Sequence, residues 1–197
     1  MALKLATAPT VEPISLTEAK LHLRVDGTDE DSRIQGLIAT ARLDVETLSL
    51  HKLVTQTWDW YMDDWPDGDI LTVPFPPLQS VTGVYYTVEG SVEVQWSSSN
   101  YLVDIYNVPG QIVLQSTASW PSGTLVEING VRVRFVCGFG AAGADVDERA
   151  RQVMLLLIGH YYEHREEVIV ERGANVMLLP QAAGALCNDL RMKVKRF

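Results

Sequence analysis

The sequence has few cysteines, no long apolar run and few basic residues. Only Cys137 and Cys187 occur among 197 residues, and no CxxC pair is present. A disulfide framework is therefore not expected, and both cysteines are interpreted as reduced and structural. The apolar run Val153 to Ile158 is far shorter than the ~20 residues that a membrane span requires. The N-terminal MALKLATAPTVEP has too short an apolar run for a signal peptide, so we expect synthesis in the cytoplasm and no membrane partner.

The charge balance is acidic. Twenty-five Asp and Glu residues face 16 Lys and Arg residues, which gives a net charge of -9. This argues against a protein whose main task is to grip nucleic acid through its phosphates, because such a grip needs clustered cations. A hydrophobic fraction of 47% with 21% charged residues is typical of a globular chain. The length fits one domain with a sizeable core or two small ones.

Residues 145–167 predict a long helix around which the rest of the chain is organised. The first apolar stripe consists of Val146, Ala150, Val153, Leu157 and Tyr161. A neighbouring stripe consists of Leu155, Ile158 and Tyr162. Two stripes favour a central helix that is covered on most sides, and the acids of its first turn suit the helix dipole.

Three further helices are predicted around it. Ser15-Leu16-Thr17-Glu18 is a capping box and predicts a short helix. A second helix is expected to open at Thr28 as the cap and to run to about Leu50 on one buried stripe. Pro180 is well placed to begin a last, short amphipathic helix.

Between the second and the central helix the pattern changes to strands. In TQTWDWYMDDW, Trp58, Trp60 and Met62 alternate with polar positions, which is typical of a strand. Further strands separated by turn sequences are expected over residues 70–73, 79–88, 92–96, 101–106, 112–114 and 125–137. Short strands at such spacings predict a small antiparallel sheet or barrel.

The predicted fold class is therefore α+β: a small bundle of about four helices with an inserted antiparallel β-sheet or barrel module. Residues 1–50 form an N-terminal arm (residues 1–13) and the first two helices. Residues 52–138 form the β module, and residues 144–197 complete the bundle with the central helix, a loop and the C-terminal helix and tail. Neither helical segment alone can bury its apolar face.

Two patterns resemble ligand motifs. Gly138-Phe139-Gly140-Ala141-Ala142-Gly143 matches GxGxxG, but it follows antiparallel strands and precedes Asp145, Asp147 and Glu148, which would repel a pyrophosphate. We interpret it as a flexible turn. His160 and His164 are spaced i, i+4, but the HExxH order and a third ligand are absent, so we interpret them as interfacial or hydrogen-bonded residues.

The remaining candidates favour structural roles. The acidic turn Asp63, Asp64, Asp67 and Asp69 does not have EF-hand spacing, and Ser97–Ser99 lacks a nucleophile elbow. All five tryptophans, Trp58, Trp60, Trp65, Trp96 and Trp120, fall in the β module, where core packing is the default and a sugar-binding platform is the alternative. We predict no catalytic residue, no metal site and no cofactor, and hence no enzyme.

Three segments in this order together resemble the head–tail connector (adaptor or head-completion) proteins of tailed bacteriophages and prophages. They are ISLTEAKLHLRVDGTDED before an amphipathic helix, PFPPLQSVTGVYY, and VRVRFVCGFG before a helix that ends GHYYEHREE. Gene transfer agents carry similar proteins. The similarity spans about residues 14–192.

The resemblance implies a structural virion protein at the neck, made in the cytoplasm of a bacterial host. Such proteins form a ring, usually of twelve subunits, beneath the portal protein, extend the DNA channel without binding DNA specifically, and dock a stopper or tail protein. The family's C-terminal helix and tail commonly engage the portal. The portal-binding residues implied here are Leu186, Leu190, Arg191, Lys193, Lys195, Arg196 and Phe197.

The subunit interface is expected on the second apolar stripe of the central helix and its histidines. Its predicted residues are Leu155, Ile158, His160, Tyr162 and His164. A ring contact joins two different patches of each protomer, and surplus apolar helix surface would supply one. Two alternatives stay open: a tail or baseplate protein whose β module binds another subunit or a glycan, and a metal- or nucleotide-dependent enzyme.

Overall fold

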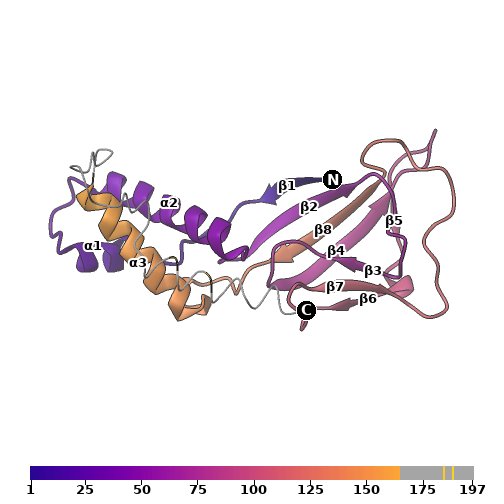
Figure 1. Cartoon of the computed structure of the whole chain (residues 1–197). Helices are drawn as coiled ribbons and strands as arrows, with labels where there is room; N and C mark the ends of the chain where they lie inside the picture. The colour runs from indigo at the N-terminus through magenta and orange to yellow at the C-terminus, as the bar shows by residue number, and fades with distance from the viewer. Residues whose placement is uncertain (165–183, 185–187, 189–197) are drawn as a thin grey trace, which may run out of the picture. The chain divides into compact units, whose positions relative to one another are not determined.

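The computed structural model describes residues 1–164, 184 and 188, and the chain divides into two compact units. The β unit comprises Met1–Thr10 and Thr55–Phe139, and the helical unit comprises Val11–Val54 and Gly140–Phe197. Each unit is built from two stretches of chain that are distant in sequence. The fold is α+β, with strands confined to one unit and α-helices to the other (Figure 1).

The larger sheet of the β unit has five strands in the order β1-β2-β8-β4-β5, all antiparallel. These strands are β1 Ala2–Thr7, β2 Gln56–Met62, β4 Leu78–Tyr86, β5 Val94–Trp96 and β8 Val131–Cys137. In β8, alternate residues are buried: Val131, Val133, Phe135 and Cys137 point inward. The period of two in the sequence thus gives one apolar and one polar face.

A smaller sheet supplies the other half of the core. It has the order β3-β7-β6, with β3 Ile70–Thr72, β6 Tyr101–Asp104 and β7 Gln111–Leu114. Leu71 and Ile112 of this sheet are buried in one cluster with Trp60, Val133 and Phe135 of the larger sheet. The described strands therefore form two open antiparallel sheets around a shared core. Of the predicted alternatives, open antiparallel pairing is confirmed and the closed barrel is wrong.

The helical unit contains α1 Leu16–Leu23, α2 Asp31–Ser49 and α3 Glu148–Glu163. The predicted capping box is confirmed at its first half, because the Ser15 hydroxyl accepts a hydrogen bond from the Glu18 N–H at 3.1 Å. Asp147 caps α3 by accepting from the Arg149 N–H at 2.9 Å. The buried residues that line the helices include Ala19, Ile34, Ile38, Ala41, Val45, Val153, Met154, Leu157 and Ile158.

Several expected boundaries differ from the structure. Helix α2 begins at Asp31 rather than at Thr28, whose carbonyl accepts the Asp31 N–H at 3.2 Å. Strand β8 begins at Val131, because Asn129 has a φ of 58° and breaks the strand predicted from residue 125. Within the predicted arm (residues 1–13), Ala2–Thr7 form strand β1 and Met1–Thr10 belong to the β unit, whereas the arm was predicted together with the first two helices.

The predicted four-helix bundle is also corrected. The part of the chain that the structure describes forms three α-helices, and the long helix ends at Glu163. Of the short helix expected from Pro180, only Gly184 and Asn188 are among the described residues, and both are helical; the rest of it lies outside them.

Candidate interaction surfaces

The predicted subunit-interface residues occupy different environments on α3. Ile158 is completely buried within the helical unit, packed among the chain's own helices. Leu155, His160 and Tyr162 are half-buried, and His164 is exposed. Part of the second apolar stripe of α3 is thus buried within the chain itself and is not free for a subunit contact. Leu155 and the two histidines remain accessible.

Tyrosine hydroxyls tie the end of α3 to α2. Tyr161 donates to the Asp44 carboxylate at 2.8 Å, and burial together with this bond raises the pKa of Tyr161. Tyr162 donates to Glu30, and its carbonyl accepts from Arg33 at 3.1 Å. The Arg33 guanidinium also lies 4.8 Å from the centre of the Tyr162 ring, in a cation–π contact. Tyr162 therefore holds the helix pair together as well as lying at the accessible end of α3.

The two histidines of α3 come together as the i, i+4 spacing requires. Their ring centres lie 4.6 Å apart, and His164 Nδ1 lies 3.0 Å from the His160 carbonyl oxygen. Within the described ranges no group of three His, Cys, Asp or Glu side chains could hold a metal ion. The predicted portal-binding residues, Leu186, Leu190, Arg191, Lys193, Lys195, Arg196 and Phe197, lie outside the described residues.

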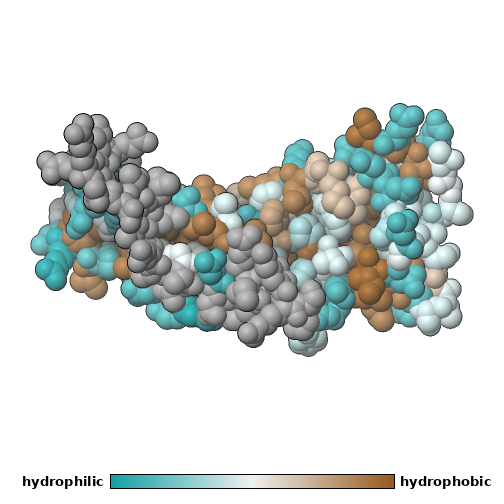
Figure 2. Space-filling view, in the orientation of Figure 1, coloured by the Kyte–Doolittle hydropathy of each residue, from teal (hydrophilic) through white to brown (hydrophobic). Residues whose placement is uncertain are grey.

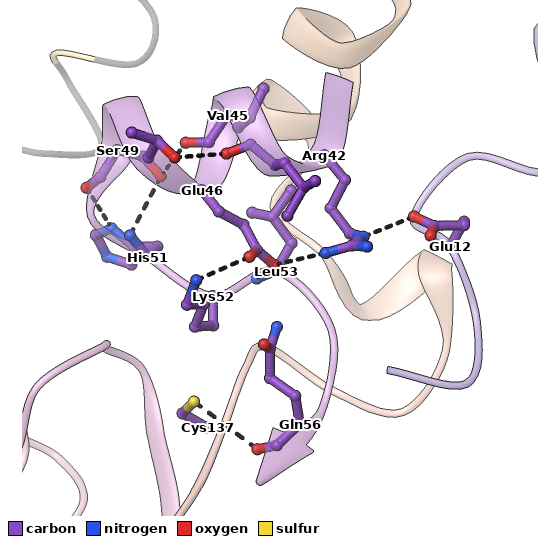
Figure 3. Close-up of polar contacts among 12 residues, drawn as sticks. Glu12, Arg42, Val45, Glu46, Ser49, His51, Lys52, Leu53, Gln56 and Cys137 are labelled. Carbon is purple, nitrogen blue, oxygen red and sulfur yellow. Dashed lines mark hydrogen bonds and ion pairs between the residues drawn. The ribbon is translucent and has the colours of Figure 1, made fainter. Parts of the chain in front are cut away.

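A buried carboxylate organises the end of α2 (Figure 3). The Glu46 side chain is 1% exposed and accepts hydrogen bonds from Lys52 Nζ at 3.0 Å and from the Leu53 N–H at 3.1 Å. Arg42 lies 3.7 Å from Glu46 and bonds Glu12 at 2.8 Å. Glu46 thus fixes the segment that follows α2, and through Arg42 it also fixes the segment that precedes α1.

A guanidinium plays the corresponding role at the start of α3. Arg151 donates to the carbonyls of Pro13 and Gly143, the latter at 2.9 Å, and to the Glu18 carboxylate at 2.7 Å. Arg151 of α3 thus holds together the segment before α1 (Pro13), the turn before α3 (Gly143) and the first turn of α1 (Glu18). Both networks are structural, because each charged group is satisfied by protein groups and neither leaves a vacant coordination position.

The outer face of the larger sheet carries an ionic network that was not predicted from the sequence. Asp59 of β2 is 4% exposed and accepts from Arg134 at 2.8 and 2.7 Å and from Arg132 at 3.1 Å. Hydrogen bonding to Arg134 lowers the pKa of Asp59 against the opposing effect of burial. Arg132 also pairs with Glu93 and lies 4.0 Å from the centre of the Tyr85 ring. The alternation in VRVRF, which places both arginines on one face, is the signal that indicates this network.

Three of the five tryptophans, Trp65, Trp96 and Trp120, pack with one another. Trp65 stacks on Trp120 with ring centres 4.8 Å apart, and Trp96 lies 5.2 Å from Trp120 and 5.4 Å from Tyr101. Trp120 donates its indole N–H to the Gly68 carbonyl at 2.9 Å. This cluster extends the core between the sheets, which favours packing over a sugar-binding platform.

The remaining motif candidates are engaged in turns. The Asp145 carboxylate accepts the Ala142 N–H at 2.9 Å and packs against Gly140, so an acid occupies the region where a dinucleotide phosphate would need positive polarity. In the acidic loop, Asp63 accepts the Asn129 N–H at 3.0 Å and Asp64 accepts the Trp65 N–H at 2.8 Å. Ser97 and Ser99 bond each other at 2.8 Å. Among the described helices, none is long and apolar enough to cross a membrane.

Two edge strands of the β unit expose apolar side chains. All six residues of β1 are exposed, and it ends the larger sheet opposite β5. β6 ends the smaller sheet, and Leu102, Val103 and the following Ile105 and Tyr106 are exposed on it and just after it. Figure 2 shows a hydrophobic patch over the smaller sheet, at the right of the view. The alternation of apolar residues in ALKLAT indicates strand β1, although only an extended arm was predicted there.

The comparisons with known proteins concern both a segment and the whole fold. Residues 13–85 match the family model described as phage gp6-like head-tail connector protein. This segment covers the first two helices and the chain through most of β4, and it includes two of the three segments on which the predicted resemblance rests. No curated protein matches the chain.

Chains from gene transfer agent particles share the fold. One, from the neck of an empty particle computed with C6 symmetry, has a TM-score of 0.79 at 23% identity. A second, from the virion of a native particle, has a TM-score of 0.76 at 24% identity, and a third, from the neck of a native particle computed with C12 symmetry, has 0.76 at 23%. Each match covers 97% of this chain and 95% of the other. The family match confirms the resemblance to head–tail connectors over residues 13–85, and the solved structures show that the fold is shared.

Proposed function

We propose that this chain is a head–tail connector, a structural protein of the neck of a phage-like or gene transfer agent particle. The observation that carries the proposal is the match of residues 13–85 to the connector family. The likeness in fold extends this over nearly the whole length of chains from gene transfer agent necks. A structural role also agrees with a described region whose buried charges are all used to hold segments of the chain together.

The chain assembles as a ring of twelve subunits beneath the portal. The necks of the similar particles were computed with C12 and C6 symmetry, and a ring of twelve is compatible with both. A ring needs two different contact patches on each copy. We assign one to the accessible part of α3, around Leu155, His160, Tyr162 and His164; Ile158, which is buried in its own chain, supports that surface from beneath.

The portal contact is assigned to the C-terminal residues. Leu186, Leu190, Arg191, Lys193, Lys195, Arg196 and Phe197 combine apolar and basic groups at the end of a chain with a net charge of -9. A basic segment of this kind fits an acidic groove on the portal, with Leu190 or Phe197 as an apolar anchor. The opposite end of the ring would then receive the stopper or tail protein.

The acidic balance suits a channel wall. A negative lumen repels the phosphates of passing DNA and so offers no site at which the DNA would be held. In this proposal DNA passes through the ring and is not bound by it.

The portal assignment is tested by deleting residues 190–197 and measuring co-sedimentation with portal rings. We expect loss of portal binding with an unchanged thermal melt, because the deleted residues follow the described core. A control variant that replaces only Lys193, Lys195 and Arg196 by Gln separates charge from length. Retained binding by the deletion variant would contradict the assignment, and immunogold labelling away from the neck in particles would contradict the connector role itself.

A further inference from the structure

We propose that strand β6 of one copy pairs, antiparallel, with strand β1 of the next copy, so that the larger sheet of one subunit continues into the smaller sheet of its neighbour. The proposal rests on the assembly of the chain as a ring. It names a second subunit contact in addition to the one on α3.

Both strands are open edges of their sheets. The larger sheet ends at β1 and the smaller one at β6, so each presents an unpaired row of backbone N–H and C=O groups to solvent within the described structure. Edge strands of soluble proteins are normally short or carry charges that prevent pairing. β6 has four residues and one charge, Asp104, but it also exposes apolar residues on both faces, Leu102 at 56% and Val103 at 37% exposure, with Ile105 at 42% just beyond.

The two edge strands lie at opposite margins of the β unit. Trp96 of β5 stacks on Tyr101 of β6 at 5.4 Å, which places β6 beside the margin formed by β5. β1 lies at the opposite margin of the same five-stranded sheet. Two different patches on opposite margins make a head-to-tail contact, the kind that generates rings.

The sequences of β1 and of β6 with the following Ile105 are complementary. In antiparallel register, Lys4 lies opposite Asp104, Leu3 opposite Ile105, and Leu5 opposite Val103. Leu3 and Leu5 then share one face with Ile105 and Val103, while Lys4 and Asp104 meet on the other face. The Asp104 carboxylate also accepts the N–H groups of Tyr106 and Asn107 in the turn after β6 and keeps its charge for Lys4. Every strand pair of the unit is antiparallel, which favours this direction over the parallel one.

A cavity beside β1 provides room for the incoming side chains. It measures about 290 Å³ and is lined by Met1, Ala2, Leu3, Trp60, Thr72 and Pro74. Leu3 pairs with Trp60 across the β1–β2 ladder, so both side chains lie on the inner face of the sheet. An Ile105 side chain opposite Leu3 would lie on this same face and fill part of the cavity.

Cysteine pairs test the contact and its register together. The matched pairs are Leu5→Cys with Val103→Cys and, independently, Leu3→Cys with Ile105→Cys; the swapped pairs, Leu5→Cys with Ile105→Cys and Leu3→Cys with Val103→Cys, use the same four exposed positions. Cys187→Ser removes one native thiol, and the other, Cys137, is completely buried. Each variant is oxidised both as concentrated purified chain and in assembled particles, and disulfide-linked ladders are read on non-reducing gels.

We expect ladders from the matched pairs and about tenfold less cross-linking from the swapped pairs, because a disulfide requires Cβ atoms about 4 Å apart. Cross-linking that is equal or greater in the swapped pairs overturns the antiparallel register. Absence of ladders from every pair, in particles as in solution, overturns the strand contact. Neck labelling of the same particles is read separately, so the connector role can stand when the strand contact fails. Thermal melts of each reduced variant verify that the exposed substitutions leave the fold intact.

Discussion

The two units each bury a carboxylate, but with partners at very different sequence distances. In the helical unit, Glu46 bonds Lys52 and Leu53, six and seven residues away. In the β unit, Asp59 bonds Arg132 and Arg134, 73 and 75 residues away. The first carboxylate closes a local turn after a helix, whereas the second fixes the register of two strands that meet only in the folded state. The same chemistry therefore serves local geometry in one unit and topology in the other.

This contrast can be followed with two separate probes. All five tryptophans lie in the β unit, and all three α-helices of the described chain lie in the helical unit. Tryptophan fluorescence therefore reports on the β unit and circular dichroism at the helical minimum mainly on the other. Coincident transitions from both probes would indicate that the chain unfolds as one cooperative system.

The largest effect is expected from Phe135→Ala in β8. Phe135 is fully buried between the sheets, and truncation leaves a cavity that lowers the free energy of unfolding by about 4 kcal/mol. The fluorescence transition should move to lower denaturant concentration, by more than the dichroism transition. Equal shifts of both transitions would show that the two units unfold together, with a single free energy of unfolding.

Glu46→Gln is expected to cost about 3 kcal/mol, since it removes the buried negative charge that pairs with Lys52 and Arg42, although Arg42 keeps its ion pair with Glu12. Here the dichroism transition should move first. Thr47→Ala is the matched control at the next position of α2. It removes only an exposed hydrogen bond from the Thr47 hydroxyl to the Leu43 carbonyl and should change stability little. A shift confined to fluorescence would show that Glu46 serves the β unit instead.

Asp59→Asn is expected to lower stability by about 2 kcal/mol at pH 7, as two arginines lose charged hydrogen bonds. The folded pKa of Asp59 is below its ordinary value of about 3.9, so its stabilisation is present above that value and is lost as the pH falls through the folded pKa. The difference between wild type and variant should therefore shrink between about pH 5 and pH 2. Denaturant titrations across this range measure it, and a difference that stays constant would remove Asp59 as the source of the pH dependence.

Ser15→Ala tests the smallest contribution, the cap of α1. Loss of the hydroxyl that accepts the Glu18 N–H should cost about 1 kcal/mol in the helical unit alone. Ser15→Asp, which can also accept this bond, should restore most of the loss. No difference between the Ala and Asp variants would show that the cap contributes nothing measurable.

Local signals in the sequence predicted local structure well. The capping residue Ser15 and the alternation of Trp58, Trp60 and Met62 each depend on neighbours within a few positions, and the structure has α1 and β2 where they indicate. Pairing between distant strands is not encoded in this way. Division into two sheets, and the docking of β1 on β2, depend on which strands meet, so the same pattern was compatible with a barrel and a free arm.

The prediction of the subunit-interface surface on α3 was limited in the same way, because it used only local periodicity. Periodicity identified two apolar stripes on α3 but could not indicate which of them the chain itself covers, and Ile158 proved to be buried by the helices of its own unit. Asp59 lies on β2 and both arginines, Arg132 and Arg134, on β8, so alternation could indicate that the arginines share a face but not that they contact Asp59.

The discontinuity of both units has a consequence for biosynthesis. The ribosome releases β1 long before its ladder partner β2, and β2 gains its second neighbour only when β8 has emerged. The helical unit waits still longer, since α3 is the last of its described helices to leave the exit tunnel. Neither unit can complete its core on a half-made polypeptide, so productive folding is postponed until translation is nearly finished, and a truncated product would expose unpaired strands to its neighbours.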